Sequence, residues 1–246
     1  MKKNYQLIIP VAGPNINFEK FKNHKLLINI QDKKLIEWVQ ISRPYKLGDG
    51  IFIFQKKHEK KYNLVKKISK LLKKKINYFL LDGYTDGAPQ SILKVKHMVN
   101  LNQPLFIDLL DQYIDFKQYL KFCLKSNIDG CIPTFQSLYH DRGYSLIDKK
   151  KNIKLISEKD LKPISTNSTG CVSYFKKANL FFYFAEQMIN KKKVSKNGKY
   201  MVSLVYNEMI KERYKIKSYD CNFIASLGTK KSIESFYENC RLVEYK

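Results

Sequence analysis

Two aspartates stand at the end of a very apolar segment. The run Pro104–Leu109 contains Asp108, and Asp111 follows two residues after its end. Carboxylates at a strand end suit a hard divalent cation that bridges phosphate oxygens, because Mg²⁺ takes one or two protein carboxylates together with substrate phosphate. We expect Asp115 to cap the next helix. This leaves Asp111 as the predicted Mg²⁺ ligand.

A small-residue turn followed by a lysine is the second feature with chemical potential. The apolar run Gln6–Val11 continues into Ala12 and Gly13, and Lys25 follows a polar loop. Such a turn lets backbone N–H groups approach phosphate, and the lysine would neutralise a triphosphate. Taken alone, a strand that ends in Ala-Gly is more often a plain tight turn.

A third segment, Asp82–Ser91, follows an apolar run and opens a helical pattern. Gly87 and Ala88 would leave room for a flat base to lie against the backbone, and Gln90 would hydrogen-bond to the edge of that base. As a lone motif, the segment is only a strand-to-helix loop.

The elements that must position these segments alternate between short apolar runs and amphipathic patterns. This alternation is typical of β-α-β units and a largely parallel sheet, with ligands at the carboxyl ends of the strands. The predicted strands are Gln6–Val11, Gly50–Phe54, Ile76–Leu81, Pro104–Leu109 and Gly130–Phe135. The predicted helices between them are Leu35–Ser42, Lys57–Lys74, Ala88–Leu101 and Phe116–Ser126.

The second half has shorter strands, and no repeat or Pro/Gly-rich hinge separates it from the first. We therefore expect one domain over residues 1–246, with a nucleotide-binding half at about 1–136 and an acceptor-binding half at about 137–246. Its predicted strands are Tyr144–Ile147, Ile153–Ile156, Gly170–Phe175 and Ser218–Ile224. Its predicted helices are Leu180–Asn190, Met201–Glu212 and one after Thr229.

The composition is strongly basic, with 46 lysines and arginines against 22 acidic residues and a formal net charge of +24. Only four of the basic residues are arginine, so the chain has few of the bidentate groups that read nucleic acids. We expect a non-specific lysine surface and no specific nucleic-acid partner. Attraction of the Lys57–Lys74 helix to a membrane surface is the alternative to a solvated helix that covers the sheet.

Several other classes of site are disfavoured. No stretch approaches the roughly 20 apolar residues of a membrane span, so we expect a cytoplasmic protein without one. The five cysteines form no C-x-x-C pair and are expected to be reduced, and the four histidines lack metal-ligand spacing. No P-loop and no nucleophile-elbow motif is present.

Taken in order, these segments resemble the sugar-phosphate nucleotidyltransferases of the GT-A-like fold, especially the branch found in capsular polysaccharide loci. The matching segments are Ile8–Gly13, Lys25, Ile36–Val39, Thr85–Gln90, Leu110–Phe116, His140–Asp148, Lys162-Pro163, Thr169–Phe175, Tyr206–Ile210 and Leu227–Thr229. The resemblance covers nearly the whole chain. It implies an α/β fold of three layers around a mostly parallel sheet, the Rossmann-type nucleotide-diphospho-sugar transferase fold, and Mg²⁺ as the cofactor.

The resemblance also implies roles for individual residues. Lys25 would face the triphosphate, Lys162 would hold the acceptor phosphate and Asp111 would hold Mg²⁺. The implied nucleotide-binding residues are Ala12, Gly13, Asn15, Gly87, Ala88 and Gln90. The implied acceptor-pocket residues are Tyr144, Asn167 and Thr169.

The chain departs from the family pattern at several positions. Pro14, Asn15, Ile16 and Asn17 stand where the family has a second glycine and an arginine. His24 replaces the proline before the family lysine, Leu161 replaces an acidic residue, and Ser226 replaces a second metal carboxylate. The lost arginine would hold triphosphate and the lost carboxylate would complete the Mg²⁺ site, so these changes bear directly on catalysis.

The leading hypothesis is a nucleotidyltransferase that joins an NTP to a sugar phosphate or a related phosphorylated metabolite and releases pyrophosphate, for capsule or surface-glycan synthesis. The base is left open, with a pyrimidine triphosphate such as CTP favoured, and so are the acceptor and the oligomeric state. Two alternatives remain: a non-catalytic nucleotide- or sugar-binding member of the fold, and a nucleotide-sugar-dependent glycosyltransferase in which Asp108 and Asp111 form a metal-holding pair.

Overall fold

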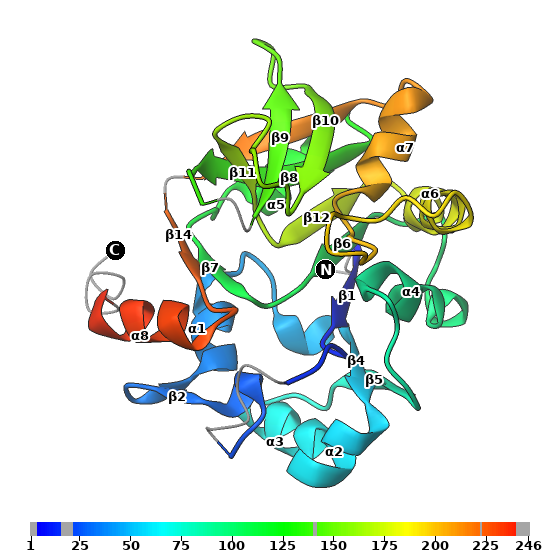
Figure 1. Ribbon diagram of the computed structural model, residues 1–246. Coiled ribbons are helices and arrows are strands. Elements are labelled where there is room, and N and C mark those ends of the chain that lie inside the picture. Colours follow the sequence, from blue (N-terminus) through cyan, green and yellow to red (C-terminus); the bar gives the residue numbers. More distant parts are fainter. Residues whose placement is uncertain (1–3, 16–21, 140–141, 222, 240–246) are drawn as a thin grey trace.

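Four parallel strands form the N-terminal part of the central sheet in the computed structural model, which describes residues 4–15, 22–139, 142–221 and 223–239. Their order is β5 (Asn77–Leu81), β4 (Ile51–Gln55), β1 (Gln6–Pro10) and β6 (Leu105–Asp108). Ile8 of β1 pairs with Ile51 on one side and with Ile107 on the other. The predicted α/β fold with a large central sheet is confirmed (Figure 1).

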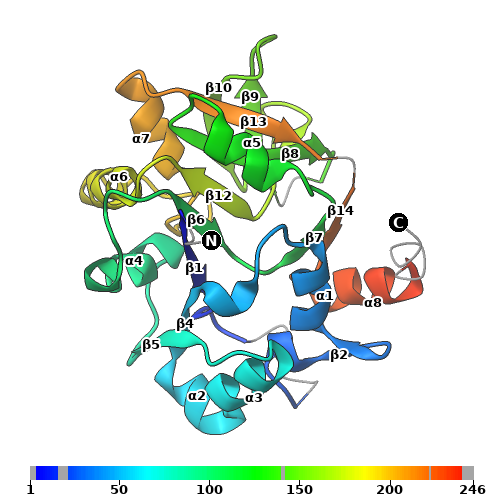
Figure 2. The ribbon, with the colours of Figure 1, turned by 180° about the vertical axis from the view of Figure 1, so that it is seen from behind.

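The sheet continues beyond β6 with mostly antiparallel strands. In order these are β12 (Val172–Phe175), β8 (Gly130–Gln136), β11 (Asn167–Thr169), β9 (Gly143–Ile147) and β10 (Ile153–Glu158). A further strand, β13 (Ile216–Asp220), pairs in parallel with β8, as Figure 2 shows from behind. The parallel character is therefore concentrated in the first half of the chain.

Helices cover both faces of the sheet because the strand residues alternate in direction. Leu7 and Ile9 of β1 belong to one buried cluster, and Ile8 belongs to the cluster on the opposite face. The first cluster is covered by α1 (Leu35–Ser42), α2 (Lys56–Tyr62), α3 (Leu64–Leu71), α5 (Tyr119–Lys125) and α8 (Lys230–Asn239). The second is covered by α4 (Ala88–Leu93), α6 (Ala178–Asn190) and α7 (Val205–Lys211).

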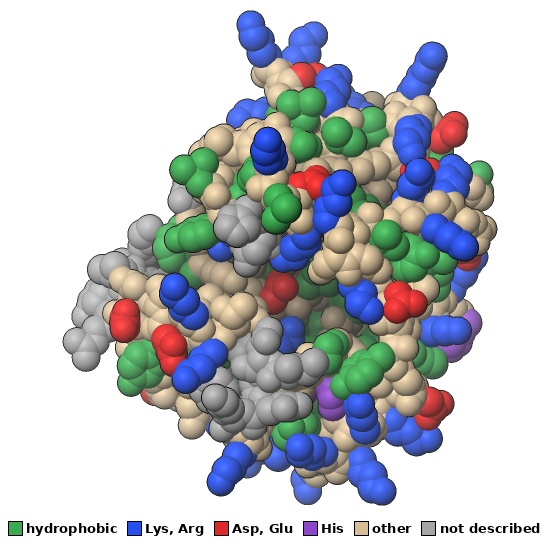
Figure 3. Space-filling model, in the orientation of Figure 1, with side chains coloured by type: hydrophobic (Ala, Val, Ile, Leu, Met, Phe, Trp, Pro, Cys, Tyr) green, Lys and Arg blue, Asp and Glu red, His purple; other side chains and the backbone are tan. Residues whose placement is uncertain are grey.

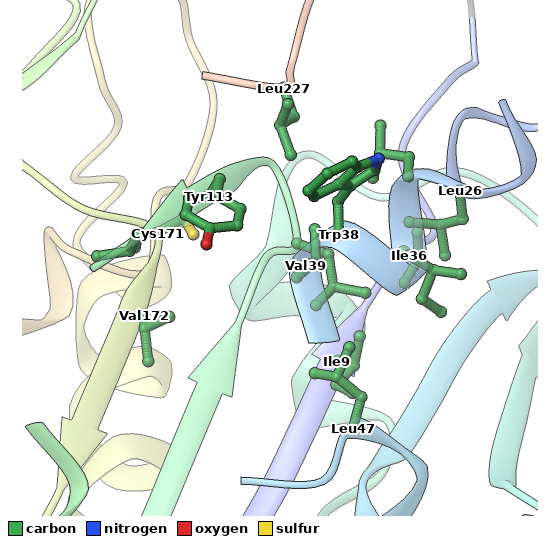
Figure 4. Close-up of a cluster of buried hydrophobic side chains, with 14 of the residues drawn as sticks. Ile9, Leu26, Ile36, Trp38, Val39, Leu47, Tyr113, Cys171, Val172 and Leu227 are labelled. Carbon is green, nitrogen blue, oxygen red and sulfur yellow. The ribbon is translucent and has the colours of Figure 1, made fainter. Parts of the chain in front are cut away.

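Short elements complete the first layer. They are η2 (Lys25–Leu27), β2 (Asn29–Ile30), β3 (Lys33–Lys34), η3 (Leu47–Asp49), η4 (Lys96–Met98), β7 (Gln112–Ile114) and β14 (Ile224–Ser226). Figure 4 shows Trp38 and Val39 of α1 among side chains from β1, β7 and β12. The ring of Trp38 is anchored, because its Nε1 donates to the carbonyl of Ile30 at 2.9 Å. This packing fixes α1, the helix that ends directly before Arg43.

Four predictions of local structure are wrong. The helix predicted over Lys57–Lys74 is two helices, because Asn63 adopts a left-handed conformation (φ 52°) that ends α2. The helix predicted over Ala88–Leu101 ends at Leu93, where hydrogen bonds tighten to three-residue spacing.

The third error concerns the strand predicted over Ser218–Ile224. Its two ends lie in different sheets: β13 pairs with β8, while β14 pairs with β7. The fourth concerns Asp115, which caps no helix, since α5 begins only at Tyr119 and the backbone N–H of Asp115 donates to Phe223 instead. The four described cysteines form no disulfide, as expected, and Cys240 lies outside the described residues. Within the described ranges, no helix is both long and apolar enough to cross a membrane.

Candidate active site

The predicted phosphate turn lies at the carboxyl ends of β1, β4 and β5. Buried Gln55 joins two loops there, since its Nε2 donates to the carbonyl of Ala12 at 3.0 Å and to that of Gly83 at 2.9 Å. No described atom lies within 4 Å of the position of a β-carbon on Gly13 or Gly83. The backbone of both loops therefore borders open space, as contact with a nucleotide requires.

Asn15 is buried and positions the segment that carries Lys25. Its Oδ1 accepts the backbone N–H of Lys25 at 3.1 Å, and its Nδ2 donates to the carbonyl of Asn23 at 3.1 Å. Both ends of the Asn15 amide are thus used within the protein. Burial lowers the pKa of the neighbouring His24 to about 3, assisted by the charges of Lys25 and His58, so His24 is neutral beside that lysine.

Asp111 follows the end of β6 and faces Lys25. Its Oδ1 is buried and has no hydrogen-bond partner among the described residues. Burial raises the pKa of Asp111; the positive charge of Lys25 opposes this rise and the negative charge of Asp108 adds to it. A buried carboxylate oxygen without a donor is a group that a cation would satisfy.

Asp108 does not share this role, which corrects the interpretation of Asp108 and Asp111 as a metal-holding pair. Its side chain is fully buried against that of Arg43, with Nε 2.6 Å from Oδ2 and Nη2 3.0 Å from Oδ1. The hydroxyl of Tyr45 donates to Oδ2 at 2.8 Å, and the backbone N–H of Leu110 donates to Oδ1 at 3.0 Å. With these donors in place, the Asp108 carboxylate is saturated.

Ser226, which the resemblance places where a second metal carboxylate would be expected, lies beside Asp111. Strand β14 pairs Ser226 with Gln112, and the backbone N–H of Leu227 donates to the Asp111 carbonyl at 2.7 Å. A β-carbon on Gly228 would lie 3.8 Å from the Asp111 β-carbon and 3.9 Å from the Ser226 hydroxyl. Among the described residues, no three His, Cys, Asp or Glu side chains form a metal-binding group.

This donor set fits Mg²⁺ in one particular way. One carboxylate oxygen without a partner, near a lysine, suits an ion that keeps several waters and takes its other ligands from substrate phosphates. It does not suit an ion held by protein groups alone. Asp111 is the residue that would hold Mg²⁺ in such a site, and this assignment stays a prediction.

The loop predicted to bind the base is held by the protein itself. The backbone N–H of Asp86 donates to Gln90 Oε1 at 2.7 Å, which uses the amide oxygen and leaves the amide nitrogen. Gly87 has φ 151°, and a β-carbon there would lie 2.0 Å from the Tyr200 carbonyl oxygen. The glycine is thus required by the close approach of Tyr200, while Ala88 begins α4 next to it. Whether these residues contact a base stays a prediction.

The predicted acceptor residues come together on β9 and β11. Thr169 is buried, and Asn167 accepts a hydrogen bond from Gln136 at 2.9 Å through Oδ1. Tyr144 is only 1% exposed, and its hydroxyl donates to the Tyr139 carbonyl at 2.5 Å. Tyr144 is therefore held within the protein by its own hydroxyl, and whether Tyr144, Asn167 and Thr169 contact an acceptor stays a prediction.

Glu158 is a buried acidic residue that the sequence analysis did not single out. It ends β10 with its carboxylate buried, and a β-carbon on Gly143 would lie 2.3 Å from Glu158 Oε1 and 2.5 Å from Thr169 Oγ1. Burial raises the pKa of Glu158; its hydrogen bond from Ser203 and the charge of Lys159 oppose the rise, and the charge of Asp111 adds to it. Glu158 and Asp111 therefore lie near enough to interact, although they come from opposite halves of the sheet.

The two lysines after Glu158 differ in placement. Lys159 is half-buried and in a left-handed conformation (φ 61°), and its backbone N–H donates to the Arg142 carbonyl at 3.1 Å. Lys162, the predicted ligand of the acceptor phosphate, is exposed in the loop between β10 and β11. The sequence signal that could have found Glu158 is the pair Glu158-Lys159, which lies four residues before Lys162-Pro163.

A hollow lies at the centre of the face shown in Figure 3, between the N-terminal layer and the strands of the acceptor half. Acidic and basic side chains are visible on its floor. In Figure 1, β1 and β6 lie next to this part of the molecule, and β9 and β11 lie above it.

Comparisons with known proteins support the fold. No protein-family model matches the chain, and no curated protein sequence matches it. Among solved structures, a nucleoside-diphosphate-sugar pyrophosphorylase from Vibrio cholerae RC9 is similar with a TM-score of 0.78 at 16% identity, over 95% of this chain and 100% of that one.

Two further structures are similar over almost their whole length. A UDP-glucose pyrophosphorylase complexed with UDP-glucose has a TM-score of 0.75 at 14% identity, over 98% of this chain and 99% of that one. A protein assigned as a glucose-1-phosphate thymidylyltransferase from Bacillus anthracis, in complex with sucrose, has a TM-score of 0.73 at 14% identity, over 96% of this chain and 95% of that one. At these identities the similarity establishes the fold, which is that of the nucleotidyltransferases and sugar-nucleotide pyrophosphorylases.

Proposed function

We propose that this chain is a nucleotidyltransferase that joins an NTP to the phosphate of a sugar phosphate or related metabolite. The observation that carries the proposal is the placement of Asp111, whose buried Oδ1 has no partner among the described residues, opposite Lys25 and within electrostatic reach of Glu158. One anionic group, one cation and a buried acid thus meet where the nucleotide-binding loops join the acceptor half.

The reaction requires positioning and charge neutralisation, and no protein nucleophile. An oxygen of the acceptor phosphate forms a bond to the α-phosphorus, the bond from that phosphorus to the bridging oxygen breaks, and pyrophosphate leaves with the electron pair. The ammonium of Lys25 would offset the charge that builds up on the triphosphate. The open backbone at Gly13 and Gly83 would let phosphate and base lie against the two loops.

Mg²⁺ bound at Asp111 would supply charge neutralisation of the phosphate oxygens. The protein's own contribution is to hold that carboxylate in place and, through the charge of Lys25, to oppose the rise in its pKa that burial causes. Since Ser226 has no charge, the protein side of this site carries one carboxylate instead of the family's two.

The acceptor would lie against β9 and β11. The buried carboxylate of Glu158 suits hydroxyl donors such as those of a sugar or a polyol, because an acceptor-only group needs donors once it is desolvated. For the acceptor phosphate, Lys162 is the residue implied by the family resemblance, and Lys159 is the alternative nearest to Glu158. We further propose a pyrimidine triphosphate, with CTP first, and a role in capsule or surface-glycan synthesis, both on the resemblance alone.

The test is product formation by the complete chain. Each of the four NTPs is incubated with Mg²⁺ and one acceptor at a time, taken from sugar phosphates, polyol phosphates and amino-acid-derived phosphates, and pyrophosphate is measured with a coupled pyrophosphatase. We expect release that requires both substrates and Mg²⁺, and an NDP-linked product by mass spectrometry. The control is Asp111→Asn, which should give no release.

Two outcomes would contradict the proposal. Sugar transfer from a nucleotide sugar without pyrophosphate release would indicate a glycosyltransferase. Nucleotide binding without turnover for any acceptor of the panel would indicate a non-catalytic binding protein, for which the uncharged Ser226 and the altered loop at Asn15 are the supporting features.

A further inference from the structure

We propose that the buried pair Arg43–Asp108 is a positioning device, which holds the turn between β6 and β7 so that Asp111 faces Lys25. The role of Asp111 itself rests on the proposed function. The bracing of the turn rests on the contacts described below, and it is tested separately.

The pair joins two elements that are distant in sequence. Arg43 follows the last residue of α1, and Asp108 is the last residue of β6. Besides its two bonds to Asp108, the guanidinium donates from Nη1 to Ser42 Oγ at 2.7 Å and from Nη2 to the Gln112 carbonyl at 3.0 Å. Arg43 therefore holds the turn on both sides of Asp111, at Asp108 and at Gln112.

The turn contains a residue in an unfavourable conformation. Leu110 has φ 56°, although its side chain is fully buried and leucine is not among the residues that readily adopt left-handed backbone geometry. Its backbone N–H donates to Asp108 Oδ1 at 3.0 Å, the same oxygen that accepts from Arg43 Nη2. Because Leu110 immediately precedes Asp111, this backbone geometry sets the direction of the Asp111 side chain.

Two neighbouring contacts fix the turn from its other side. The backbone N–H of Cys171 donates to Gln112 Oε1 at 2.8 Å, and the backbone N–H of Leu227 donates to the Asp111 carbonyl at 2.7 Å. The turn is thus bonded to residues next to β12 and β14, and among the hydrogen bonds of the described residues the one to the backbone of Leu110 comes from Asp108.

Stability alone is a weak reason to bury these charges. A buried ion pair can usually be replaced by apolar residues without loss of stability, because desolvation offsets the attraction between the charges. Here each charge also bonds to backbone groups of a single turn. An apolar pair would fill the same space and could not make those bonds, so the contacts assign the pair to the geometry of the turn.

Two matched triple variants separate these roles. The apolar variant is Arg43→Met with Tyr45→Phe and Asp108→Leu. The polar variant is Arg43→Gln with Tyr45→Phe and Asp108→Asn, in which the asparagine Oδ1 can still accept the Leu110 N–H. Both are neutral at this position and both remove the Tyr45 hydroxyl, so they differ in the polar groups offered to the turn: an acceptor for the Leu110 N–H at position 108 and a donor for the Gln112 carbonyl at position 43. The thermal midpoint shows whether each variant is folded.

The readouts are amide hydrogen exchange and steady-state kinetics. We expect the Leu110 and Leu227 amides to exchange at least tenfold faster in the apolar variant than in the polar one, with unchanged exchange in β4 as the internal control. We also expect kcat to be at least tenfold lower in the apolar variant, with KM for NTP altered less than threefold, because the loops at Gly13 and Gly87 are not touched. A purely structural role would change the thermal midpoint and leave kcat per folded molecule unaltered.

Equal exchange of Leu110 in the two folded variants overturns the proposal, and so does faster exchange with an unchanged kcat. If either variant fails to fold, amide exchange is measured in the unaltered protein instead. Its Leu110 amide must then exchange as slowly as the amides of β6, and fast exchange of Leu110 contradicts the claim that the pair holds the turn. Absence of turnover in the unaltered protein contradicts the proposed function instead, and the exchange comparison still decides whether the pair holds the turn.

Discussion

Replacing Asp111 by asparagine should abolish activity and at the same time stabilise the unliganded protein. The amide keeps the shape of the side chain and loses the anionic ligand. Removal of one preorganised electrostatic group costs about 2.7–4 kcal/mol, or roughly 10²–10³-fold in kcat. Stability should move the other way by about 1 kcal/mol, because the buried Oδ1 is a charged oxygen without a donor among the described residues.

The pH dependence of this stabilisation has a definite sign. Burial raises the pKa of Asp111 in the folded state above its unfolded value, although Lys25 opposes the rise. The folded state therefore binds the proton more tightly, so ionised Asp111 lowers the free energy of unfolding at neutral pH, and this penalty disappears as the pH falls through the raised pKa. The gain from Asp111→Asn should be largest near pH 7 and should vanish in acid.

The measurement combines urea unfolding at several pH values with pyrophosphate release at saturating NTP and Mg²⁺. Asp115→Asn is the matched control, since Asp115 lies four residues further and its N–H only pairs with Phe223, so it should change neither quantity. Wild-type turnover in Asp111→Asn refutes the metal assignment. An Asp111→Asn protein that is less stable at pH 7 refutes the argument from the unpaired oxygen.

Four other predictions concern charge at the site and on the surface. Lys25→Ala should lower kcat/KM for NTP by the equivalent of about 1.5–3 kcal/mol, as expected for the loss of a charge-assisted hydrogen bond. Lys22 is exposed, and Lys22→Ala should lower kcat/KM more than tenfold only if the Lys22 ammonium replaces the lost arginine. Single-turnover kinetics with varied NTP concentration measures both effects. Whichever of Lys159→Ala and Lys162→Ala raises KM for the acceptor tenfold or more identifies the lysine that binds the acceptor phosphate. If neither variant changes KM, neither lysine binds that phosphate. Because the protein side offers Asp111 alone, calorimetry should detect no Mg²⁺ binding at millimolar concentration without nucleotide, and tight binding of the free ion would contradict this. DNA binding, measured by fluorescence anisotropy, should be independent of sequence and fall steeply with salt, and tight binding to one sequence at physiological ionic strength would revive a nucleic-acid function.

Strand positions were predictable because burial imposes a simple pattern. The runs at Gln6–Val11 and Pro104–Leu109 are apolar on both faces, as strands covered by helices on both sides must be, and they correspond to β1 and β6. Periodicity alone did not reveal the break at Asn63, because the apolar stripe of α2 and α3 continues across it. The separation of β13 from β14 was equally hidden, since partner choice across a sheet is a tertiary property.

The site was predictable only where one residue carries the chemistry. Asp111 and Lys25 were proposed from residue type and order along the chain, and in the structure the charge of Lys25 acts on the Asp111 carboxylate. Asp108 was misinterpreted because its carboxylate suits a cation equally well until a partner is known, and that partner, Arg43, lies 65 residues away in the chain. Glu158 was not singled out, because its burial depends on partners that are distant in sequence: β10 pairs it with Gly143 of β9, and Ser203 donates a hydrogen bond to its carboxylate.

The positions at which the sequence differs from the nucleotidyltransferases that it resembles become coherent when they are considered together as charge. The uncharged Ser226 and the saturated Asp108 leave Asp111 as the carboxylate that can hold the metal, and the loss of the loop arginine leaves Lys25 as its cationic counterpart. The missing carboxylate removes one negative charge and the missing arginine removes one positive charge, so the net charge of the protein groups around Asp111 is unchanged. With one carboxylate fewer, the protein attracts free Mg²⁺ less strongly. A site of this kind depends on the geometry of its one remaining carboxylate, which explains why a buried ion pair and a strained leucine are placed directly behind it.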